Sequence, residues 1–336
     1  MKKKHKLCVL VTGGAGYIGS HMAKMLCRDN HEVIIFDNLS TGNKESLNYG
    51  TFVKGDLTNI EDVENLFQDF KFDVVIHFAA FSIVSESVAN PAKYFRNNVI
   101  SLLNLLDTML KFSTRNIIFS STAALYGEPQ YLPIDENHVI RPINPYGESK
   151  AICEKILENY CDAYSFNAIS LRYFNACGAD LDCELGERHN PETHLIPLVL
   201  HAGIGKKESI KVFGHDYPTK DGTCIRDYVH VIDICSAHKI AMHNLIDQNI
   251  KGFDNFNVGG SSGYSVNEVI KVAREILNRD GFEIKIEVEH RRPGDPAVLI
   301  ASSGKLEKLG WKREFSNLET IISSSWEFEK KFYRPK

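Results

Sequence analysis

The sequence predicts an α/β protein built on a doubly wound parallel sheet, with a second, smaller α/β domain. Three observations support this prediction. Short β-rich apolar runs alternate with stretches long enough for helices, which is the β-α-β repetition of a parallel sheet. The runs are apolar without strict alternation, as in strands covered on both faces. A glycine-rich turn also follows the first run and opens a helical stretch.

The expected elements follow in chain order. The predicted strands are Leu7–Thr12, Val33–Phe36, Thr51–Lys54, Val74–His77, Asn116–Ser120 and Ala168–Tyr173. After Ala176 the pattern gives way to a region rich in proline, histidine and glycine, which we expect to be mostly loop until about Thr223. Beyond it, residues 226–246 read as a strand and a helix, and 252–260 as a further strand. These later segments are expected to return to the first domain.

Composition limits the possible functions. The chain has 336 residues, 43% of them hydrophobic and 24% charged, enough for one large core or two moderate ones. The net charge of -4 comes from interspersed charges, which disfavours nucleic-acid binding. The apolar run behind the basic start is too short for a signal peptide or a membrane helix, so a cytoplasmic protein without membrane partners is expected. Eight cysteines without C-x-x-C spacing favour reduced thiols.

The glycine-rich turn is the first chemical motif. In VTGGAGYIGSHMAKML, Gly13, Gly16 and Gly19 follow a strand and open a helix, and Gly14, Gly16 and Gly19 also fit G-x-G-x-x-G. Either register places unpaired N–H groups at a helix N-terminus, where a pyrophosphate binds well. Asp37 ends the second strand 18 residues after Gly19, where a carboxylate accepts hydrogen bonds from adenosine ribose and repels a 2′-phosphate. The sequence therefore favours NAD over NADP; a helix-capping role for this aspartate is the minor alternative.

Two further segments extend the cofactor prediction. Asp56 follows the third strand, where its carboxylate could accept from the adenine amino group or equally cap the helix after Thr58. The segment HFAA, His77 to Ala80, ends the fourth strand in small residues that let a dinucleotide lie close, although plain packing would explain them too. We place an NAD-binding Rossmann domain at residues 1–176, with returning segments near 225–260, and a substrate-binding domain at 177–336.

Tyr146 and Lys150 are the candidate catalytic pair. Residues four apart are neighbours on a helix, so the ammonium can stand beside the phenol and favour the phenolate. A free tyrosine titrates near ~10, so Lys150 and an oxidised nicotinamide would have to lower its pKa for it to act as a base. Thr122, in SSTAALYG after the fifth strand, could bridge the substrate oxygen and Tyr146. Y-x-x-x-K alone is a common surface pair, but its place after a nucleotide-binding motif favours catalysis.

Together these motifs resemble a known family. TGGAGYIGSH, FDNLSTG, GDL, HFAA, SSTAALYG and NPYGESK resemble the extended short-chain dehydrogenase/reductases that act on nucleotide sugars, and most of all their 4-epimerases. LRYFNACGA, THLIP, FGHDYPTKDGTCIRDYVHV and RRPGD follow in the family's order, so the resemblance covers nearly the whole chain. It implies an isomerase that interconverts UDP-glucose and UDP-galactose through a 4-keto intermediate on tightly bound NAD, a step of galactose metabolism.

The resemblance also implies site residues. The expected cofactor-binding set is Gly13, Gly16, Tyr17, Ile18, Gly19, Asp37, Asn38, Asp56, Leu57, Phe78, Ala79, Ala80, Asn97, Ser120, Tyr146, Lys150, Tyr173 and Phe174. The expected substrate-binding set is Thr122, Tyr146, Asn175, His194, Leu195, Val212, Phe213, Arg226, Tyr228, Arg292, Asp295 and Leu299. Arg226 and Arg292 would hold the diphosphate, because guanidinium forks match phosphate oxygens. A surface ion pair with Asp227 or Asp295 is the alternative for either arginine.

This chain departs from the family pattern at three positions. Thr122 stands where many members have serine, which keeps the hydroxyl. His194 stands where the family has asparagine, which leaves its substrate contact open. Leu299 borders the sugar pocket where family members differ in bulk, and a leucine is smaller than a tyrosine. N-acetylated UDP-sugars are therefore expected to fit as well.

Particular residues disfavour some other functions and leave others open. Nucleotide-sugar 4,6-dehydratases carry the residues T-D-E after the fifth strand. This chain has Ala123 and Ala124 after Thr122, and alanine cannot transfer a proton, so dehydration and decarboxylation are disfavoured. UDP-N-acetylglucosamine and UDP-glucuronate 4-epimerases stay open. A non-catalytic NAD-binding regulator would have lost Tyr146 or Lys150. No metal site is expected, because the histidines are scattered and His189 and His194 lie in a proline-containing loop without ligand spacing.

A homodimer is expected from the segment 91–112. Its apolar residues form a broad surface: Phe95, Val99, Leu102, Leu103, Leu106 and Leu110, with Ile100 and Leu105 to one side. Such a surface needs covering, either by a second copy or by the second domain. The resemblance favours the second copy, because in the family this helix and the one with Tyr146 form a dimer interface.

Overall fold

The computed structural model describes residues 6–291 and 295–333. These residues form two compact units. Unit 1 comprises residues 6–127, 139–172 and 235–256. Unit 2 comprises residues 128–138, 173–234, 257–291 and 295–333. The chain therefore crosses between the units several times, and a few of its elements have residues in both.

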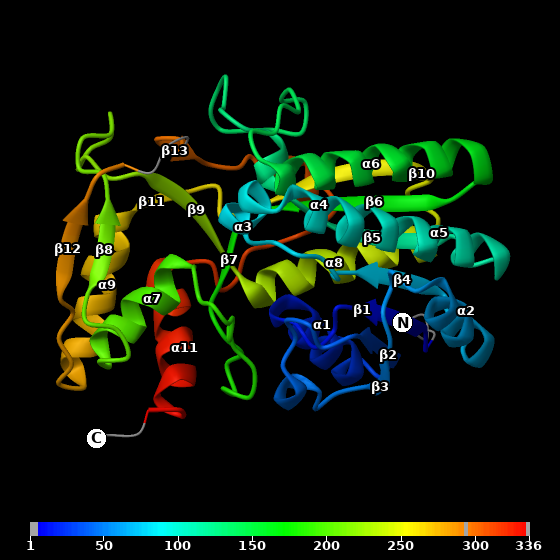
Figure 1. Cartoon of the computed structure of the whole chain (residues 1–336), viewed down its shortest axis with the longest axis horizontal. Helices are drawn as coiled ribbons and strands as arrows, with labels where there is room; N and C mark the ends of the chain where they lie inside the picture. Colours follow the sequence, from blue (N-terminus) through cyan, green and yellow to red (C-terminus); the bar gives the residue numbers. More distant parts are fainter. Residues whose placement is uncertain (1–5, 292–294, 334–336) are drawn as a thin grey trace. The chain divides into compact units, whose positions relative to one another are not determined.

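A seven-stranded sheet forms the centre of unit 1, in the order β10-β6-β5-β4-β1-β2-β3 (Figure 1). The strands are β1 (Cys8–Thr12), β2 (Glu32–Asp37), β3 (Thr51–Lys54), β4 (Val74–His77), β5 (Asn116–Thr122), β6 (Asn167–Tyr173) and β10 (Gly252–Val258). The pairs from β3 through β2, β1 and β4 to β5 are parallel. The strand order reverses between β1 and β4, the point at which such sheets bind ligands.

Helices cover both faces of this sheet (Figure 1). The helices are α1 (Tyr17–Arg28), α2 (Ile60–Asp69), α3 (Val84–Ala89), α4 (Pro91–Tyr94), α5 (Ser101–Lys111), α6 (Pro145–Tyr164) and α8 (Val231–Ile246), with short 3-10 turns η1 (Lys44–Ser46) and η3 (Ala123–Leu125) and a π-helical turn η2 (Phe95–Ile100). Buried residues of α2, α5 and α6 share one core with the sheet. On the other face α1 and α8 are linked by an ion pair between Asp29 and Lys239, 2.7 Å apart.

The predicted fold class and its six strands are confirmed. β3 and β4 have the predicted bounds, and the other four strands differ from the prediction by one or two residues at an end. The expectation of loop after Ala176 is wrong in part, because α7 (Leu195–Gly203) and β8 (Ile210–Phe213) lie within that region. α7 is apolar on most sides, so it lacks the one-sided period by which an amphipathic helix is recognised.

Unit 2 holds two small sheets and three main helices. Its elements are β7 (Asn175–Cys177), β9 (Ile225–His230), β11 (Gly263–Ser265), α9 (Val266–Arg279), β12 (Ile286–Glu289), β13 (Val298–Leu299), α10 (Gly304–Glu307) and α11 (Leu318–Lys330), besides α7 and β8. β9 pairs with β7, β11 and β13, and β8 pairs with β12. Ser265 and Glu268 form a capping box that starts α9.

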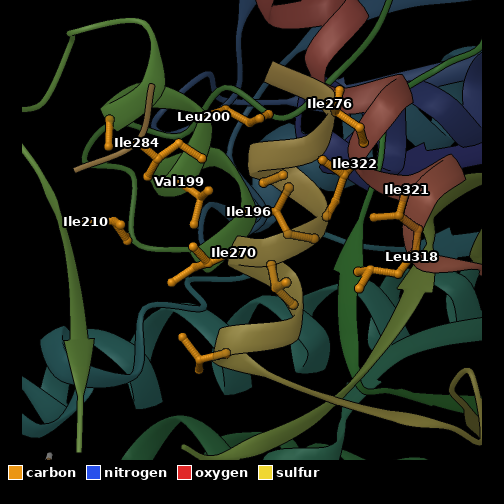
Figure 2. Close-up of a cluster of buried hydrophobic side chains, with 14 of the residues drawn as sticks. Ile196, Val199, Leu200, Ile210, Ile270, Ile276, Ile284, Leu318, Ile321 and Ile322 are labelled. Atoms are coloured by element: carbon orange, nitrogen blue, oxygen red, sulfur yellow. The ribbon is translucent and has the colours of Figure 1, made fainter. Parts of the chain in front are cut away.

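The core of unit 2 lies between α7, α9 and α11. Figure 2 shows isoleucine and leucine side chains of these helices meeting, with Ile210 of β8 and Ile284 beside them. Val199, Leu200, Ile321 and Ile322 are fully buried there. Burying each such side chain contributes about 1.5–3 kcal/mol, which makes this cluster the main stabilising feature of the unit.

Two expectations concern the whole chain. All eight cysteines are free thiols, as predicted. Among the residues that the structure describes, none of the helices is both long and apolar enough to cross a membrane.

Candidate active site

The turn after β1 is shaped by glycines. Gly13 has φ of +70°, and a Cβ there would lie 2.6 Å from the backbone nitrogen of Ala79. A Cβ on Gly19 would lie 2.3 Å from the Gly13 oxygen, so the first turn of α1 packs directly on the loop. Gly16 is the N-cap of α1 and provides no side-chain cap, which leaves the N–H groups of the first turn to a ligand. A Cβ at Gly16 would meet only the Gly13 oxygen within 4 Å, so this open helix end fits the pyrophosphate of a dinucleotide.

Asp37 closes this loop from the end of β2. Its carboxylate accepts hydrogen bonds from the Ala15 N–H at 3.0 Å and the Leu39 N–H at 2.8 Å. Burial raises the pKa of Asp37 above its ordinary value, and the two N–H bonds act in the opposite direction. The carboxylate therefore stands beside the glycine loop, where the sequence predicted the adenosine ribose contact.

Asp56 and Asn38 form a pair at the ends of β3 and β2. Asn38 donates to Asp56 Oδ2 at 2.9 Å, and Thr58 donates to Asp56 Oδ1 from both its N–H and its hydroxyl. The N-cap of α2 is Asn59, which accepts from the Glu61 N–H, so the capping alternative for Asp56 is wrong. Leu57 is buried in the unit core, which leaves its backbone for any ligand contact.

Further predicted cofactor residues of unit 1 lie in the segments that follow β4 and α4. Phe78, Ala79 and Ala80 follow β4, and the Phe78 ring lies 4.7 Å from the ring of His238. Asn97 lies in the π-helical turn η2, a type of irregularity that occurs often at functional sites. Its neighbour Asn98 is buried and binds Phe81 and Ser149, which ties the segment after β4 to α6.

Tyr146 lies in the first turn of α6. Asn144 caps the helix by accepting from the Gly147 N–H at 2.8 Å, and Pro145 is its first residue. A Cβ on Gly147 would lie 2.6 Å from the Ala124 oxygen, so this glycine lets the helix start close to η3, next to Thr122. The Thr122 side chain lies beside that of Tyr146 and acts to lower the pKa of the tyrosine. The structure thus brings together the tyrosine and the threonine that the sequence predicted to cooperate.

The surroundings of Tyr146 favour the neutral phenol. Burial raises the pKa of Tyr146 above its ordinary value, while Thr122 acts in the opposite direction. Lys150 donates to the Ser120 oxygen at 2.7 Å, and its ammonium lies 4.6 Å from the centre of the Phe119 ring. Burial lowers the pKa of Lys150 to about 8. Lys150 is therefore a buried cation held at the end of β5.

A buried ion pair that the sequence reasoning missed holds α6 in place. The Glu154 carboxylate accepts hydrogen bonds from Arg172 Nε at 3.0 Å, from Arg172 Nη2 at 2.6 Å and from the Ser121 hydroxyl at 2.5 Å. Arg172 also donates to the Tyr126 hydroxyl at 2.9 Å. Burial alone would lower the pKa of Arg172, but the bond to Glu154 raises it overall. A carboxylate four residues after Lys150, on the buried face of the helix, was the available signal.

Two of the predicted substrate residues form an ion pair in unit 2. Arg226, on β9, pairs with Asp295, and its Nη1 donates to the Ile225 oxygen at 2.8 Å. This is the ion pair of the alternative interpretation, but the Arg226 side chain is only 12% exposed, so the pair is not on the open surface. Arg292, the second predicted arginine, lies outside the described residues.

Asp227, next to Arg226, has a structural role that the sequence did not indicate. It is fully buried and accepts from the N–H groups of Gly260, Ser261 and Ala301. Burial raises the pKa of Asp227 to about 7 against the effect of these bonds. The carboxylate therefore joins β9 to two loops of unit 2.

The other predicted substrate residues are spread over unit 2. The Asn175 side chain donates to the backbone oxygen of Asp227 at 2.8 Å, and Tyr228 is buried on β9. Val212 faces the unit core, whereas its neighbour Phe213 and Leu299 of β13 are half-buried. Tyr173 ends β6, and the Phe174 N–H donates to the Val258 oxygen at 3.1 Å.

His194 and Leu195 lie at the start of α7. His194 is the N-cap, but its side chain makes no cap bond; its Nδ1 lies 2.8 Å from Glu187 and 2.9 Å from Glu192. These two carboxylates raise the pKa of His194 to about 10, although its side chain is 48% exposed. Leu195 packs against the core. The imidazole is therefore directed at acidic groups of its own loop.

Comparison with known proteins decides the family. The family model described as GDP-mannose 4,6 dehydratase matches residues 10–324. The chain is 46% identical over 325 residues to the UDP-glucose 4-epimerase of Halalkalibacterium halodurans, with 96% of each chain covered. It is 45% identical over 324 residues to that of Streptococcus mutans, covering 95% of this chain and 96% of the relative. The chain belongs to the NAD-dependent epimerase/dehydratase family of extended short-chain dehydrogenase/reductases.

Solved structures of this family have the same fold. The crystal structure of UDP-glucose 4-epimerase from Brucella ovis, in complex with NAD, matches with a TM-score of 0.91 and 44% identity, covering 96% of this chain and 98% of the other. The UDP-Glc/GlcNAc 4-epimerase from Campylobacter jejuni matches with a TM-score of 0.84 and 41% identity, covering 97% and 99%. Within the epimerase/dehydratase family, Ala123 and Ala124 after Thr122 separate this chain from members that need acids there.

Proposed function

We propose that this protein interconverts UDP-glucose and UDP-galactose by inverting C4 of the hexose, with NAD bound tightly throughout. The observation that carries this proposal is the placement of Thr122 beside Tyr146, with Lys150 one helical turn further along α6. This group lies at the carboxyl edge of the same sheet as the glycine loop. Full-length relatives of the family at 40–46% identity are named UDP-glucose 4-epimerase.

The chain's own residues would move one proton out and back. Bound NAD would supply the redox chemistry by accepting the C4 hydride and returning it to the other face. Tyr146 would take the proton of the 4-hydroxyl as general base and return it as general acid, with Thr122 orienting both oxygens. Because burial raises the pKa of Tyr146, a positive charge must offset it, and Lys150 is the candidate. Alanines at 123 and 124 would leave elimination of water without an acid.

Residues of unit 2 are proposed to hold the nucleotide. Arg226 keeps donor groups besides those bonded to Asp295 and Ile225, enough for a diphosphate. Asp295 is proposed for the uridine ribose, and Asn175, Tyr228 and Phe213 for the remaining contacts. Firm binding of the UDP group would let the keto-hexose turn over while the nucleotide stays in place.

The test is turnover of UDP-galactose by the purified protein without added NAD. We expect UDP-glucose to form, because the cofactor remains bound and no net redox change occurs. Parallel assays with UDP-N-acetylgalactosamine and UDP-glucuronate measure the alternatives. Absence of product from UDP-galactose, with NAD present in the protein, would refute the proposal; turnover of UDP-glucuronate alone would assign the uronate activity instead.

N-acetylated UDP-hexoses are proposed as further substrates. Leu299 pairs with Arg226 across β13 and β9 and is half-buried, so this position carries a side chain of moderate size near the proposed diphosphate site. A named UDP-Glc/GlcNAc 4-epimerase is 41% identical to the chain. If the parallel assay shows no turnover of the N-acetylated sugar, this proposal is wrong and the enzyme does not act on N-acetylated UDP-hexoses.

Replacing Gly13 with alanine is expected to abolish NAD retention. The Cβ would meet the Ala79 backbone at 2.6 Å, and the φ of +70° is itself unfavourable for alanine by about 1 kcal/mol. Gly205 is the matched control, because its φ is +72° but nothing lies within 4 Å of a Cβ. We expect Gly205→Ala to keep its NAD, measured by absorbance of the extracted cofactor. Equal NAD content in both variants would contradict the placement of the loop.

A homodimer is proposed from apolar residues that stay exposed. Leu102, Leu105 and Leu106 are buried in the core of unit 1, so much of the predicted surface is covered within the chain. Ile100 on η2 and Ile152 on α6, two elements in contact, remain 42% and 36% exposed. Light scattering should give twice the chain mass, and Ile100→Lys with Ile152→Asp should shift it toward the monomer. A monomer for the unmodified chain at all concentrations would reject the dimer.

A further inference from the structure

The loop between β7 and α7 gathers two histidines and two glutamates. One potential ligand atom from each of Glu187, His189, Glu192 and His194 lies within 4.8 Å of all the others. The Nδ1 atoms of His189 and His194 both approach Glu187 Oε1, at 3.1 and 2.8 Å. Glu192 approaches the same two atoms, at 3.9 Å from His189 and 2.9 Å from His194. Four groups therefore converge on one point.

This spacing matches the dimensions of a tetrahedral zinc site. Zinc binds histidine nitrogen and carboxylate oxygen at about 2.0–2.2 Å, so neighbouring ligand atoms around it lie roughly 3.3–3.5 Å apart. The nitrogen–oxygen distances of the cluster, 2.8 to 3.9 Å, bracket that value. The four ligand atoms, all within 4.8 Å of one another, are therefore spaced close to what a single ion between them requires.

We propose that Glu187, His189, Glu192 and His194 bind a zinc ion. Two imidazoles with two carboxylates suit zinc better than calcium or magnesium, which prefer oxygen ligands alone. Four protein ligands leave no open position, so the site is structural rather than catalytic. This goes beyond the proposed epimerase activity and does not depend on it.

Charge balance supports an ion at this place. The side chains of Glu187 and Glu192 are only 6% and 7% exposed, although both belong to a loop. Buried carboxylates are costly unless they are paired or bind a metal. Two carboxylates, two neutral imidazoles and one Zn²⁺ add to zero charge. The competing arrangement is a metal-free network in which protonated histidines pair with the glutamates.

The site would fix the start of α7. His194 is the N-cap of that helix, and Glu192 Oε1 accepts from the N–H groups of Thr193 and His194 at 2.7 and 2.8 Å. An ion bound to both side chains would hold the loop and the helix start together. It would also keep the His194 ring away from a nucleotide, which bears on the contact that the sequence left open.

The spacing of the histidines predicted no metal site. The ligands follow the pattern E-x-H-x-x-E-x-H over eight residues, in which the carboxylates supply half of the set. Only the folded loop shows that one ligand atom of each of the four side chains lies within 4.8 Å of the others. The proposal therefore departs from that expectation on the geometry of the loop.

The experiment measures metal in the full-length protein after removal of any histidine tag. The metal-free chain is titrated with Zn²⁺ against a chromogenic chelator, and the metal content is measured after dialysis. We expect one zinc per chain. His194→Asn is the main variant, because asparagine is a good N-cap and should preserve α7; we expect it and Glu187→Gln to retain less than a tenth of the metal.

Matched controls and a second readout make the test decisive. Glu184→Gln changes an exposed glutamate of the same loop, and His215→Ala an exposed histidine outside it; both should retain one zinc per chain. Cobalt in the unmodified protein should give the intense visible absorption of a tetrahedral site, even if a variant fails to fold. Zinc binding no stronger than in Glu187→Gln, or a weak octahedral cobalt spectrum, would overturn the proposal in favour of the ion-pair network.

Discussion

Tyr146→Phe is expected to lower kcat for UDP-galactose by about 10³-fold, within the range of general acid–base catalysis. The phenylalanine keeps the ring at the start of α6 but removes the hydroxyl that lies beside Thr122. Without it, no side chain of the Tyr146–Thr122 pair can take the proton at neutral pH. The measurement is steady-state turnover, with bound NAD determined in the same sample.

Tyr160→Phe is the matched control for this substitution. Tyr160 lies on the same helix, and its hydroxyl donates to Asp107 at 2.6 Å, so it loses a hydrogen bond remote from Tyr146. We expect Tyr160→Phe to retain kcat within about twofold, because none of the proposed catalytic groups contacts it. If Tyr146→Phe turned over UDP-galactose at the same rate as Tyr160→Phe, another group would have to be the base.

Glu154→Gln is expected to lower the free energy of unfolding by about 3–5 kcal/mol, the cost of leaving a buried charge without its partner. The amide would keep one acceptor oxygen for Arg172 Nε and the Ser121 hydroxyl, but it would present an NH2 group to Arg172 Nη2 and remove the negative charge that pairs with the guanidinium. Urea denaturation of the purified protein measures the change. The loss should also reduce kcat, because α6 carries both Tyr146 and Lys150.

A surface pair on the same helix is the control for Glu154. Glu158 pairs with Lys155 at 2.6 Å, but both side chains are about half-exposed or more. Glu158→Gln should therefore cost less than about 1 kcal/mol. Glu154→Leu combined with Arg172→Leu should recover much of the stability, because it removes both charges. A Glu154→Gln variant as stable as Glu158→Gln would show that the buried pair does not hold α6.

The sheet of unit 1 could be predicted from local patterns. Its strands are continuous apolar runs bounded by turn residues, and each run can be recognised without knowing its neighbours. α7 could not be recognised in this way. Its sequence LIPLVLHAG is apolar on most sides because it packs against α9 and α11, so its period depends on elements more than sixty residues away.

The residues of the candidate site likewise divide into those that a short motif predicts and those that only the fold brings together. The glycine loop, Asp37 and the Tyr146–Lys150 pair were predicted because each lies within a short motif whose spacing reflects helix or turn geometry. Glu154, Arg172 and Asp227 were missed because each partner comes from another part of the chain. The ion pair of Arg226 with Asp295 joins residues 69 positions apart and was expected only as an alternative.

By itself the sequence determined the fold class and predicted the nucleotide loop, the candidate catalytic pair and, through its family resemblance, the expected substrate. These depend on spacings of a few residues, which the geometry of turns and helices converts directly into distances. Only the tertiary structure decided which charges are buried, that burial raises the pKa of Tyr146, and that four side chains of one loop converge at Glu187. Burial and convergence are properties of the packed chain, because they depend on segments that no local pattern relates.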